Sequence, residues 1–525
     1  MAKDSAPSPG GLRSTWAILA ITGLGAFIAA LDQTVVVTAL PGVMLDLKIP
    51  ITELDRVSWI ITSYLLGYTV AMPLIGRLGD VYGYPRVYQA SLIVFCIGTI
   101  LVAVAPNFEW MIGARVIQAI GGGGTVPIGM ALATTLAPPE RRALALGVVG
   151  GAAEAGSMLG PAYGGAIVEL SGWRWIFWLN VPQAAVVFAA LMWLPGAMLI
   201  PLRRGRPHSD PLPEGEGTAR VDYLGGALLV AALLLLSLAL SRKDLFTLDS
   251  PIPFVLAASG LGLFGMLVMV ERRIWQPLLA RVFLRSWSFI VSNLTQALVG
   301  VSLILAMVTV PLTADTVMQK EPFTGAMWLL RMTGVIPLAS VAGGWLLSYN
   351  LRSGRGAALL GARTLTVAGL LMVAAGLFLC SRWELGVDDP ELTLQLLLAG
   401  SGFGLVIAPI LHRALSAVGG DYRATGASLV TVSRMMGMTL GLAAMSAWGV
   451  EHFQVLTSGL EFPILQPGES SGAHAARLEQ YSADLNTAGL TVFRNFFRAG
   501  AIVALAAVPF ALLPERLGRS DDSSL

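Results

Sequence analysis

Long apolar stretches separated by short polar segments dominate the chain. Fourteen of them lie between Trp16 and Leu513, each about 18 to 28 residues long. At a rise of 1.5 Å per residue, each is about long enough to cross a ~30 Å hydrocarbon layer as a helix. Because unpaired backbone groups are too costly in lipid, the pattern predicts an all-α polytopic membrane protein.

The spacing of these stretches predicts fourteen transmembrane helices in a plan of six, two and six. The expected spans are residues 15–41, 57–76, 87–106, 109–136, 143–168, 173–195, 223–241, 252–271, 287–312, 323–347, 361–380, 392–415, 425–449 and 489–513. An N-terminal six-helix bundle would cover 15–195 and a C-terminal bundle 287–513, with two inserted helices at 223–271.

The polar segments predict connections and termini. Residues 1–14 and 514–525 are the expected cytoplasmic ends, and 196–222, rich in Arg, Pro and Gly, is an expected cytoplasmic linker. Residues 450–488 form an expected outer loop with five acids, interpreted as a solvated connector or as a segment that attracts cations.

Composition and charge placement fit this arrangement. Hydrophobic residues make up 55% of the chain and charged residues 13%, which leaves no room for a large soluble domain. When the loops are assigned alternately to two sides, one side holds 21 of the 34 Lys and Arg residues and the other holds eight. The positive-inside bias makes the richer side cytoplasmic, with both termini there, in the cell membrane.

Several classes of function are disfavoured. The sequence has no Gly-Lys pair, hence no Gly-x-x-x-x-Gly-Lys phosphate loop, and its four histidines are scattered. Cys96 and Cys380 lie far apart in apolar spans, where packing is the simplest role. We expect no cofactor, no metal, no nucleic-acid partner and no enzymatic activity.

The loop after the second span carries Gly76, Asp80, Gly83 and Arg86. The glycines permit a tight turn and a close helix approach, and Asp80 can accept hydrogen bonds from a neighbouring helix N-terminus or pair with an arginine. This combination predicts a gating loop, with an ordinary polar turn as the alternative.

Asp32, Arg115 and Gln118 are polar residues within the first and fourth spans. An arginine in mid-span costs ~3 kcal/mol unless it is paired or hydrated, so Arg115 should face a cavity or a partner. Asp32 and Arg115 lie about 14 Å and about 9 Å from the outer ends of their helices, so we expect them to pair. Asp32 could then exchange a proton or form a static ion pair.

The fifth span contains Gly156, Gly160, Pro161, Gly164 and Gly165. Small residues four apart allow two helices to touch, and a proline removes a hydrogen bond so that the helix can bend. Glu154 lies about 17 Å into the same span. An unpaired carboxylate there suits a proton carrier or a contact to a cationic substrate; the alternative is a neutral Glu154 bonded to a neighbouring helix.

The second half offers further polar residues within spans. Asn293 and Gln296 lie three apart on one helix and should face a central cavity. Arg434 is expected at the cavity too. For Arg331, substrate contact and structural pairing are equally open.

These motifs, in this order, resemble the major facilitator superfamily and, within it, the fourteen-span drug:proton antiporters. The sequence Gly76 to Arg86 is similar to the family's signature loop, although Val81 and Tyr84 stand where basic residues are usual. The counterpart loop, Gly343 to Arg355, lacks the acid. Arg115 with Gln118 looks like the second motif of the family. The Gly160-Pro161 pair, followed by the Trp173-Arg174-Trp175 start of the sixth span, resembles the exporters of the family.

The resemblance implies alternating access by a single chain in the lipid bilayer. The expected partners are protons and a small-molecule substrate. Efflux of lipophilic, often cationic compounds in exchange for protons is the first expectation, with Asp32 and Glu154 as coupling candidates. Export or flipping of a lipid or specialised metabolite, and a sensor that does not transport, are the alternatives.

Overall fold

A computed structural model describes residues 9–48, 54–193, 223–240, 250–271, 281–353, 361–387, 389–418, 420–465 and 470–513. All regular secondary structure in these ranges is helical. The expected linker at 196–222 and residues 1–8 and 514–525 of the expected termini lie outside them.

Six helices form the first bundle, as the apolar pattern predicts. They are α1 (Pro9–Asp46), α2 (Leu54–Tyr82), α3 (Tyr84–Ala103), α4 (Phe108–Leu136), α5 (Arg142–Ser171) and α6 (Arg174–Trp193). Helix α1 packs along α5, α4 packs against α2 and α3, and α3 also contacts α6. Helix α4 is central, since 83% of its most apolar window is buried.

The second bundle repeats this arrangement with its own six helices. They are α11 (Trp287–Leu312), α12 (Pro322–Ser353), α13 (Ala362–Cys380), α14 (Glu391–Val418), α15 (Arg423–Thr457) and α16 (Ser471–Leu512). Again the first helix packs along the fifth, the fourth contacts the second and third, and the third contacts the sixth. A π-helical turn, Thr313–Val317, extends α11.

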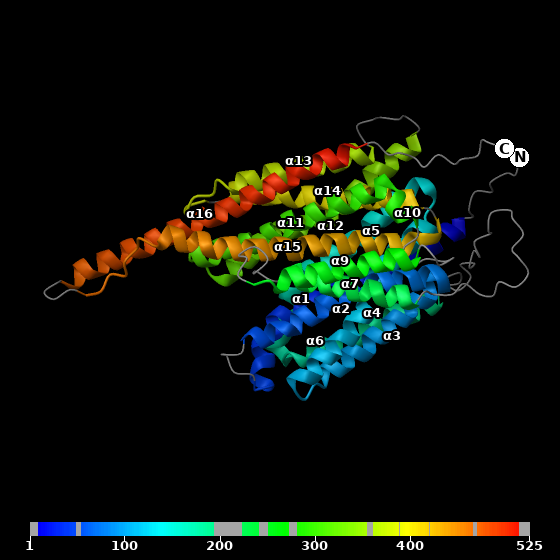
Figure 1. The fold of residues 1–525 in the computed structure, drawn as a ribbon, viewed down its shortest axis with the longest axis horizontal. Helices are drawn as coiled ribbons and strands as arrows, with labels where there is room; N and C mark the ends of the chain where they lie inside the picture. The colour runs from blue at the N-terminus through cyan, green and yellow to red at the C-terminus, as the bar shows by residue number, and fades with distance from the viewer. Residues whose placement is uncertain are drawn as a thin grey trace, which may run out of the picture.

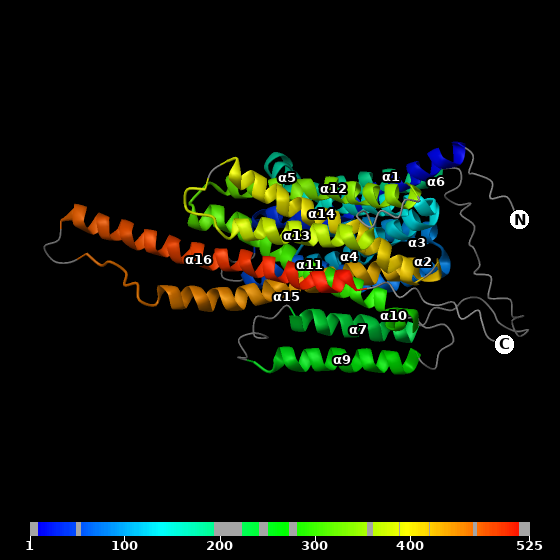
Figure 2. The same cartoon turned by 90° about the horizontal axis from the view of Figure 1, so that it is seen from above.

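Two further apolar helices, α7 (Tyr223–Leu240) and α9 (Ile252–Glu271), form a pair at the edge of the molecule (Figure 2). Helix α7 contacts both α2 and α15, one helix from each bundle. Only 17% of the apolar window of α9 is buried, in keeping with a lipid-facing role. A short helix, α10 (Arg281–Arg285), precedes α11.

The predicted number of membrane spans is confirmed in part. Thirteen helices of the described ranges are long and apolar enough to cross a membrane, and Leu224–Leu240 of α7 is a shorter apolar helix. The architecture of two six-helix bundles with an inserted pair is present, while fourteen crossings remain a prediction.

The two bundles meet at the end where α2 finishes and α15 begins, which is the predicted cytoplasmic end. There α5 packs on α12 and α2 on α15. A Cβ on Gly147 would lie 2.5 Å from the Ser340 carbonyl oxygen, and one on Gly344 would lie 2.5 Å from that of Ala143, so the backbones touch. Towards the opposite end the ribbons of the bundles diverge (Figure 1).

The expected outer loop at 450–488 is largely helical. Helix α15 runs on to Thr457 and α16 starts at Ser471, so both extend well past the predicted spans and project from the bundle (Figure 1). The reason is that segment 471–488 is rich in Ala, Leu, Glu, Gln and Arg, which favour helix even in water. We call these two extensions, Val450–Thr457 and Ser471–Thr487, with their connection the outer hairpin.

Candidate functional site

Asp32 lies at the centre of a fully buried hydrogen-bond network in the first bundle. Arg115 Nη1 donates to Asp32 Oδ2 at 2.9 Å, so the two residues pair as their depths predict. The other oxygen, Oδ1, accepts from Gln118 Nε2 at 3.0 Å and from Asn180 Nδ2 at 2.7 Å. Three donors from two helices therefore compensate the carboxylate that α1 buries.

Arg115 is enclosed by aromatic and polar groups. Its Cζ lies 4.1 Å from the centre of the Tyr64 ring, and its Nη1 also donates to Gln118 Oε1 at 2.7 Å. Gln118 in turn donates to Thr99 Oγ1 at 2.9 Å. Arg115 and Gln118 have no exposed surface. Of the cavity or partner expected for Arg115, the structure shows the partner, Asp32. A contact of Arg115 or Gln118 with a substrate stays a prediction.

Glu154 and Arg434 form an ion pair between the two bundles. Glu154 Oε1 accepts from Arg434 Nη1, and the two side chains are only 14% and 17% exposed. The sequence suggested either an unpaired Glu154 or a neutral one; the structure pairs it with an arginine that is distant in sequence. Thr69 Oγ1 lies 3.6 Å from Met435 Sδ beside this pair, a second contact between the bundles.

Asn293 and Gln296 belong to the interior of the second bundle. Asn293 Oδ1 accepts from Ser433 Oγ at 2.8 Å, next to Arg434, and its Nδ2 donates to the Phe289 carbonyl. Gln296 is 4% exposed. A contact of Asn293 or Gln296 with a substrate stays a prediction.

Arg331 is held at the outer side of the second bundle. Its Nη1 donates to both carboxylate oxygens of Asp389, at 2.6 and 2.9 Å, and to Thr393 Oγ1 at 2.7 Å. The hydrogen bond from Thr393 and the Arg331 guanidinium hold the pKa of Asp389 below its ordinary value. The sequence left substrate contact and structural pairing open for Arg331, and these contacts are those of a structural pair.

The predicted gating loop binds the start of α15. Asp80 Oδ1 accepts from the Ala424 backbone N–H at 3.0 Å, and Oδ2 accepts from the Thr425 N–H at 2.9 Å and Thr425 Oγ1 at 2.6 Å. This is the helix N-terminus contact that the sequence suggested. Tyr84, which replaces a usual basic residue, donates its hydroxyl to Asp80 at 2.9 Å.

The rest of the loop fits the same contact. A Cβ on Gly76 would lie 2.8 Å from the Ala424 carbonyl oxygen, and Gly83 has a φ of 95°, which favours glycine. Arg86 is exposed in the first turn of α3.

The small residues of α5 place it directly against α1. A Cβ on Gly156 would lie 2.1 Å from the Phe27 carbonyl oxygen, and one on Gly160 would lie 1.9 Å from Thr34 Oγ1. A Cβ on Gly164 would be similarly close to Thr38, whereas one on Gly165 would meet nothing within 4 Å. Pro161 is inside the helix. Three of the four glycines therefore serve close packing.

The outer hairpin exposes large apolar side chains outside the bundle. On its helices and connection these are Val450, Phe453, Val455, Leu456, Phe462, Ile464, Leu465 and Leu478. The connection 459–465 and α16 enclose a hollow of about 440 Å³ whose wall includes Arg477, Tyr481 and Asp484. The Phe462 and Tyr481 rings meet edge to face with centroids 5.6 Å apart.

Two similar bundles joined at one end, with buried charges between and within them, define a helical membrane transporter rather than an enzyme. The family model described as Major Facilitator Superfamily matches residues 22–442, and the chain belongs to this superfamily.

Relatives with curated descriptions cover almost the whole chain. A triacylglyceride transporter of Mycobacterium tuberculosis is 33% identical over 511 residues, or 93% of this chain and 92% of that protein. A triacylglyceride transporter of Mycolicibacterium smegmatis is 30% identical over 507 residues, or 93% and 86%.

Solved structures share the fold at low identity. A human organic anion transporter has a TM-score of 0.53 and 17% identity over 93% of this chain and 99% of that chain. A proton:xylose symporter has a TM-score of 0.55 and 13% identity over 95% and 97%. The bacterial relatives point to the plasma membrane as the location of the chain.

Proposed function

We propose that this transporter exports an apolar lipid, of the triacylglyceride class, in exchange for protons. The relatives named as triacylglyceride transporters support the substrate class, and this was the alternative that the sequence left open. The observation that carries the proposal is the outer hairpin. Apolar side chains that project from the membrane region need an apolar cargo or surface to contact.

The charges in the bundle interior favour a neutral cargo. A cationic compound is best recognised by a carboxylate that no other cation compensates. Asp32 is fully buried against Arg115, and Glu154 is paired with Arg434. Both carboxylates in mid-span that the sequence singled out are therefore already neutralised in this conformation.

The position of Glu154 between the bundles supports proton exchange as part of the proposal. A proton on Glu154 would end its attraction to Arg434 and release one link between the bundles. The bundles could then separate at that level and close at the other end. A membrane potential contributes about 2.3 kcal/mol per charge per 100 mV to such a step. Asp32 with Arg115 is the second candidate, deeper within the first bundle.

The test uses purified protein in liposomes with a fluorescent triacylglyceride and an imposed pH gradient. We expect lipid release to a soluble acceptor in the wild type, and at least tenfold slower release in Glu154→Gln. Glu169→Gln is the matched control, because Glu169 is an exposed carboxylate near the end of the same helix. Lipid movement that ignores the gradient would contradict proton exchange; no lipid movement would contradict the lipid substrate.

Proton-driven efflux of lipophilic cations is the second candidate. The close packing of α1 on α5 around Gly160 and the adjacent Pro161 supports it, since this motif resembles the exporters of the family. The same liposomes loaded with cationic dyes distinguish the two. Dye efflux without lipid release would favour drug export.

A further inference from the structure

The bundles meet along two seams, which differ in what covers them. We call them the α2–α15 seam and the α5–α12 seam, after the helices that touch there. Helix α7 contacts both α2 and α15 and so lies over the first seam, with α9 on its outer side (Figure 2). The inserted pair is therefore placed where it can act on one seam and not equally on both.

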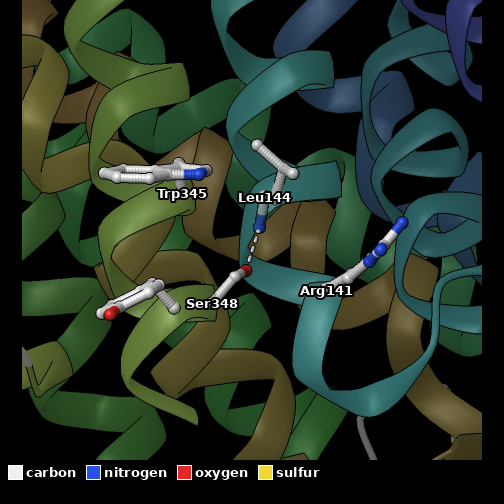
Figure 3. A pocket seen from close by; sticks show the side chains of 5 residues that line it. Arg141, Leu144, Trp345 and Ser348 are labelled. Atoms are coloured by element: carbon white, nitrogen blue, oxygen red, sulfur yellow. Dashed lines mark hydrogen bonds between the residues drawn. The ribbon is translucent and has the colours of Figure 1, made fainter. Parts of the chain in front are cut away.

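The α5–α12 seam is only loosely covered at the predicted cytoplasmic end. A pocket of about 230 Å³ lies there between the start of α5 and the last turns of α12, and Figure 3 shows Leu144 and Ser348 at it. The Leu144 backbone N–H donates to Ser348 Oγ at 3.0 Å. Trp345 and Tyr349 beside this contact are 55% and 56% exposed. Because these rings are already half exposed, separation of the helices uncovers little further apolar surface at this edge.

Helix α7 is fixed on the α2–α15 seam by its buried face. Leu233 is 6% exposed and joins the apolar cluster that contains Met72 of α2 and Val430 of α15. A Cβ on Gly260 of α9 would lie 3.1 Å from the Ala232 carbonyl oxygen, so α9 packs closely on α7. Separation of α2 from α15 would pull α7 away from at least one of them and expose apolar surface.

An aromatic residue holds the cytoplasmic end of the same seam. Tyr422 is the N-cap residue of α15, two residues before the Ala424 N–H that donates to Asp80. Arg77, three residues before Asp80 on α2, is 7% exposed, and its Cζ lies 4.9 Å from the centre of the Tyr422 ring. A cation at this distance is attracted to the face of the ring, more strongly where water is excluded. Arg77 with Tyr422 is thus a second contact between α2 and the start of α15.

A ring from α10 also contacts Tyr422. Phe283 is 3% exposed and meets the Tyr422 ring edge to face, with centroids 5.7 Å apart. Its centroid also lies 5.0 Å from that of Phe289 in the first turn of α11. Because α10 follows the inserted pair in the chain, the segment from α7 to α10 contacts the α2–α15 seam along its length and at its cytoplasmic end.

We propose that the segment from α7 to α10 is a brace that makes the α2–α15 seam the hinge when the predicted cytoplasmic end opens. Tyr422 and Phe283 are its positioning residues. The α5–α12 seam then separates furthest, because its separation leaves the brace contacts intact. This direction of opening does not depend on which cargo is carried, so it stands or falls separately from the proposed substrate.

Two cysteine variants at matched depth test the hinge. Ser428 is fully buried at the α2–α15 seam, five residues from the start of α15, and Ser348 is 3% exposed at the α5–α12 seam, five residues from the end of α12. Each serine is replaced by cysteine in a protein whose Cys96 and Cys380 are changed to alanine, and labelling by a hydrophilic maleimide is followed in lipid nanodiscs.

After normalisation to the rates in denatured protein, we expect Ser348→Cys to react at least fivefold faster than Ser428→Cys. Equal rates, or a faster reaction of Ser428→Cys, would overturn the proposal.

Variants of the aromatic contact test the cause of this difference. Phe283→Ala and Tyr422→Leu should raise the labelling rate of Ser428→Cys at least fivefold and change that of Ser348→Cys less than twofold. Tyr422→Phe should stay within twofold of the parent because it keeps the ring. An equal rise at both positions would contradict a brace on one seam. Should Phe283→Ala fold poorly, Phe283→Leu gives the same readout.

A double variant separates a shared contact from two structural losses. If Arg77 and Tyr422 act as one contact, Arg77→Gln added to Tyr422→Leu should change the labelling rate of Ser428→Cys less than twofold further. A double variant whose effect is the product of the two single effects would show that the residues act independently, against the proposal.

The part of α7 is tested by two neighbouring leucines. Leu233→Ala should raise the labelling rate of Ser428→Cys at least threefold, because it loosens the buried face of α7. Leu234→Ala is the matched control, since Leu234 is 37% exposed on the same helix. No change in Leu233→Ala, or an equal change in both, would mean that α7 does not brace the seam.

Discussion

At the scale of single residues, two carboxylates in the interior of this transporter are each compensated by an arginine. Asp32 accepts from Arg115, Gln118 and Asn180, and Glu154 pairs with Arg434. Removing one partner of a buried pair leaves the other charge uncompensated, which costs about 3–5 kcal/mol. Stability and proton exchange must therefore be separated in any test of these residues.

Asp32→Asn should lower the free energy of unfolding by about 3–5 kcal/mol, because Arg115 stays buried without its counter-ion. The double variant Asp32→Asn with Arg115→Gln should recover most of that loss, since it removes the orphaned charge. Chemical unfolding in detergent measures the stability, and substrate flux under a pH gradient measures the exchange. If the double variant keeps the full gradient-driven flux, Asp32 is not a coupling group.

The contact of Arg331 with Asp389 predicts a pH dependence at the outer side. Because the folded pKa of Asp389 lies below its ordinary value near 3.8, the pair stabilises the protein above that value. Its contribution is lost as the pH falls through the folded pKa. We expect the difference in melting temperature between wild type and Asp389→Asn to be constant from pH 8 to 5 and to shrink below about pH 4. A difference that disappears already near pH 6 would contradict this assignment.

At the scale of elements, the contact of α1 with α5 depends on the absence of side chains. Gly160→Ala should destabilise the protein by about 1–3 kcal/mol, since its Cβ would overlap Thr34 and the neighbouring backbone of α1. Gly165→Ala is the matched control in the same helix, because a Cβ there meets nothing within 4 Å. Thermal unfolding of both variants checks the prediction, and equal melting temperatures would count against it.

The helices themselves were predictable because apolar length alone decides what can span a bilayer. The ends of the helices were not predictable from hydropathy. Hydropathy falls where a helix leaves the membrane, whereas the helix propensity of residues 471–488 stays high. Depth along each helix sufficed to pair Asp32 with Arg115. It could not pair Glu154 with Arg434, because they lie in different bundles whose relative placement no local pattern specifies.

Two contributors to these sites were also missed. Asn180 is one of the few polar residues in a largely apolar helix, a signal that could have drawn attention to it. Tyr84 was read as a lost charge in the gating loop, whereas its hydroxyl supplies a hydrogen bond to Asp80. Geometry, rather than residue type, determines both roles.

At the scale of the whole molecule, the two bundles are joined at one end, where Asp80 binds the N-terminus of α15. Asp80→Asn should weaken the contact with the α15 N-terminus, because an amide keeps one acceptor where the carboxylate has two. The predicted cytoplasmic end would then open more often.

Labelling of a cysteine at the buried position 428, near Gly76, measures this opening. We expect a membrane-impermeant maleimide to react at least fivefold faster in Asp80→Asn than in its parent. Glu140→Gln, an exposed acid at the same end, should not change the rate. An unchanged rate in Asp80→Asn would show that this loop does not control closure.

Helix α15 connects distant parts of the molecule as one continuous helix. It meets Asp80 through Thr425, crosses mid-bundle at Arg434 and ends at Thr457, with no proline along its course. The distance from Thr425 to Thr457 is about 48 Å at 1.5 Å per residue. A tilt of a few degrees at the predicted cytoplasmic end would therefore move the far end of the helix by several ångströms. We predict that α15 alone transmits an opening at the Asp80 contact to the outer hairpin.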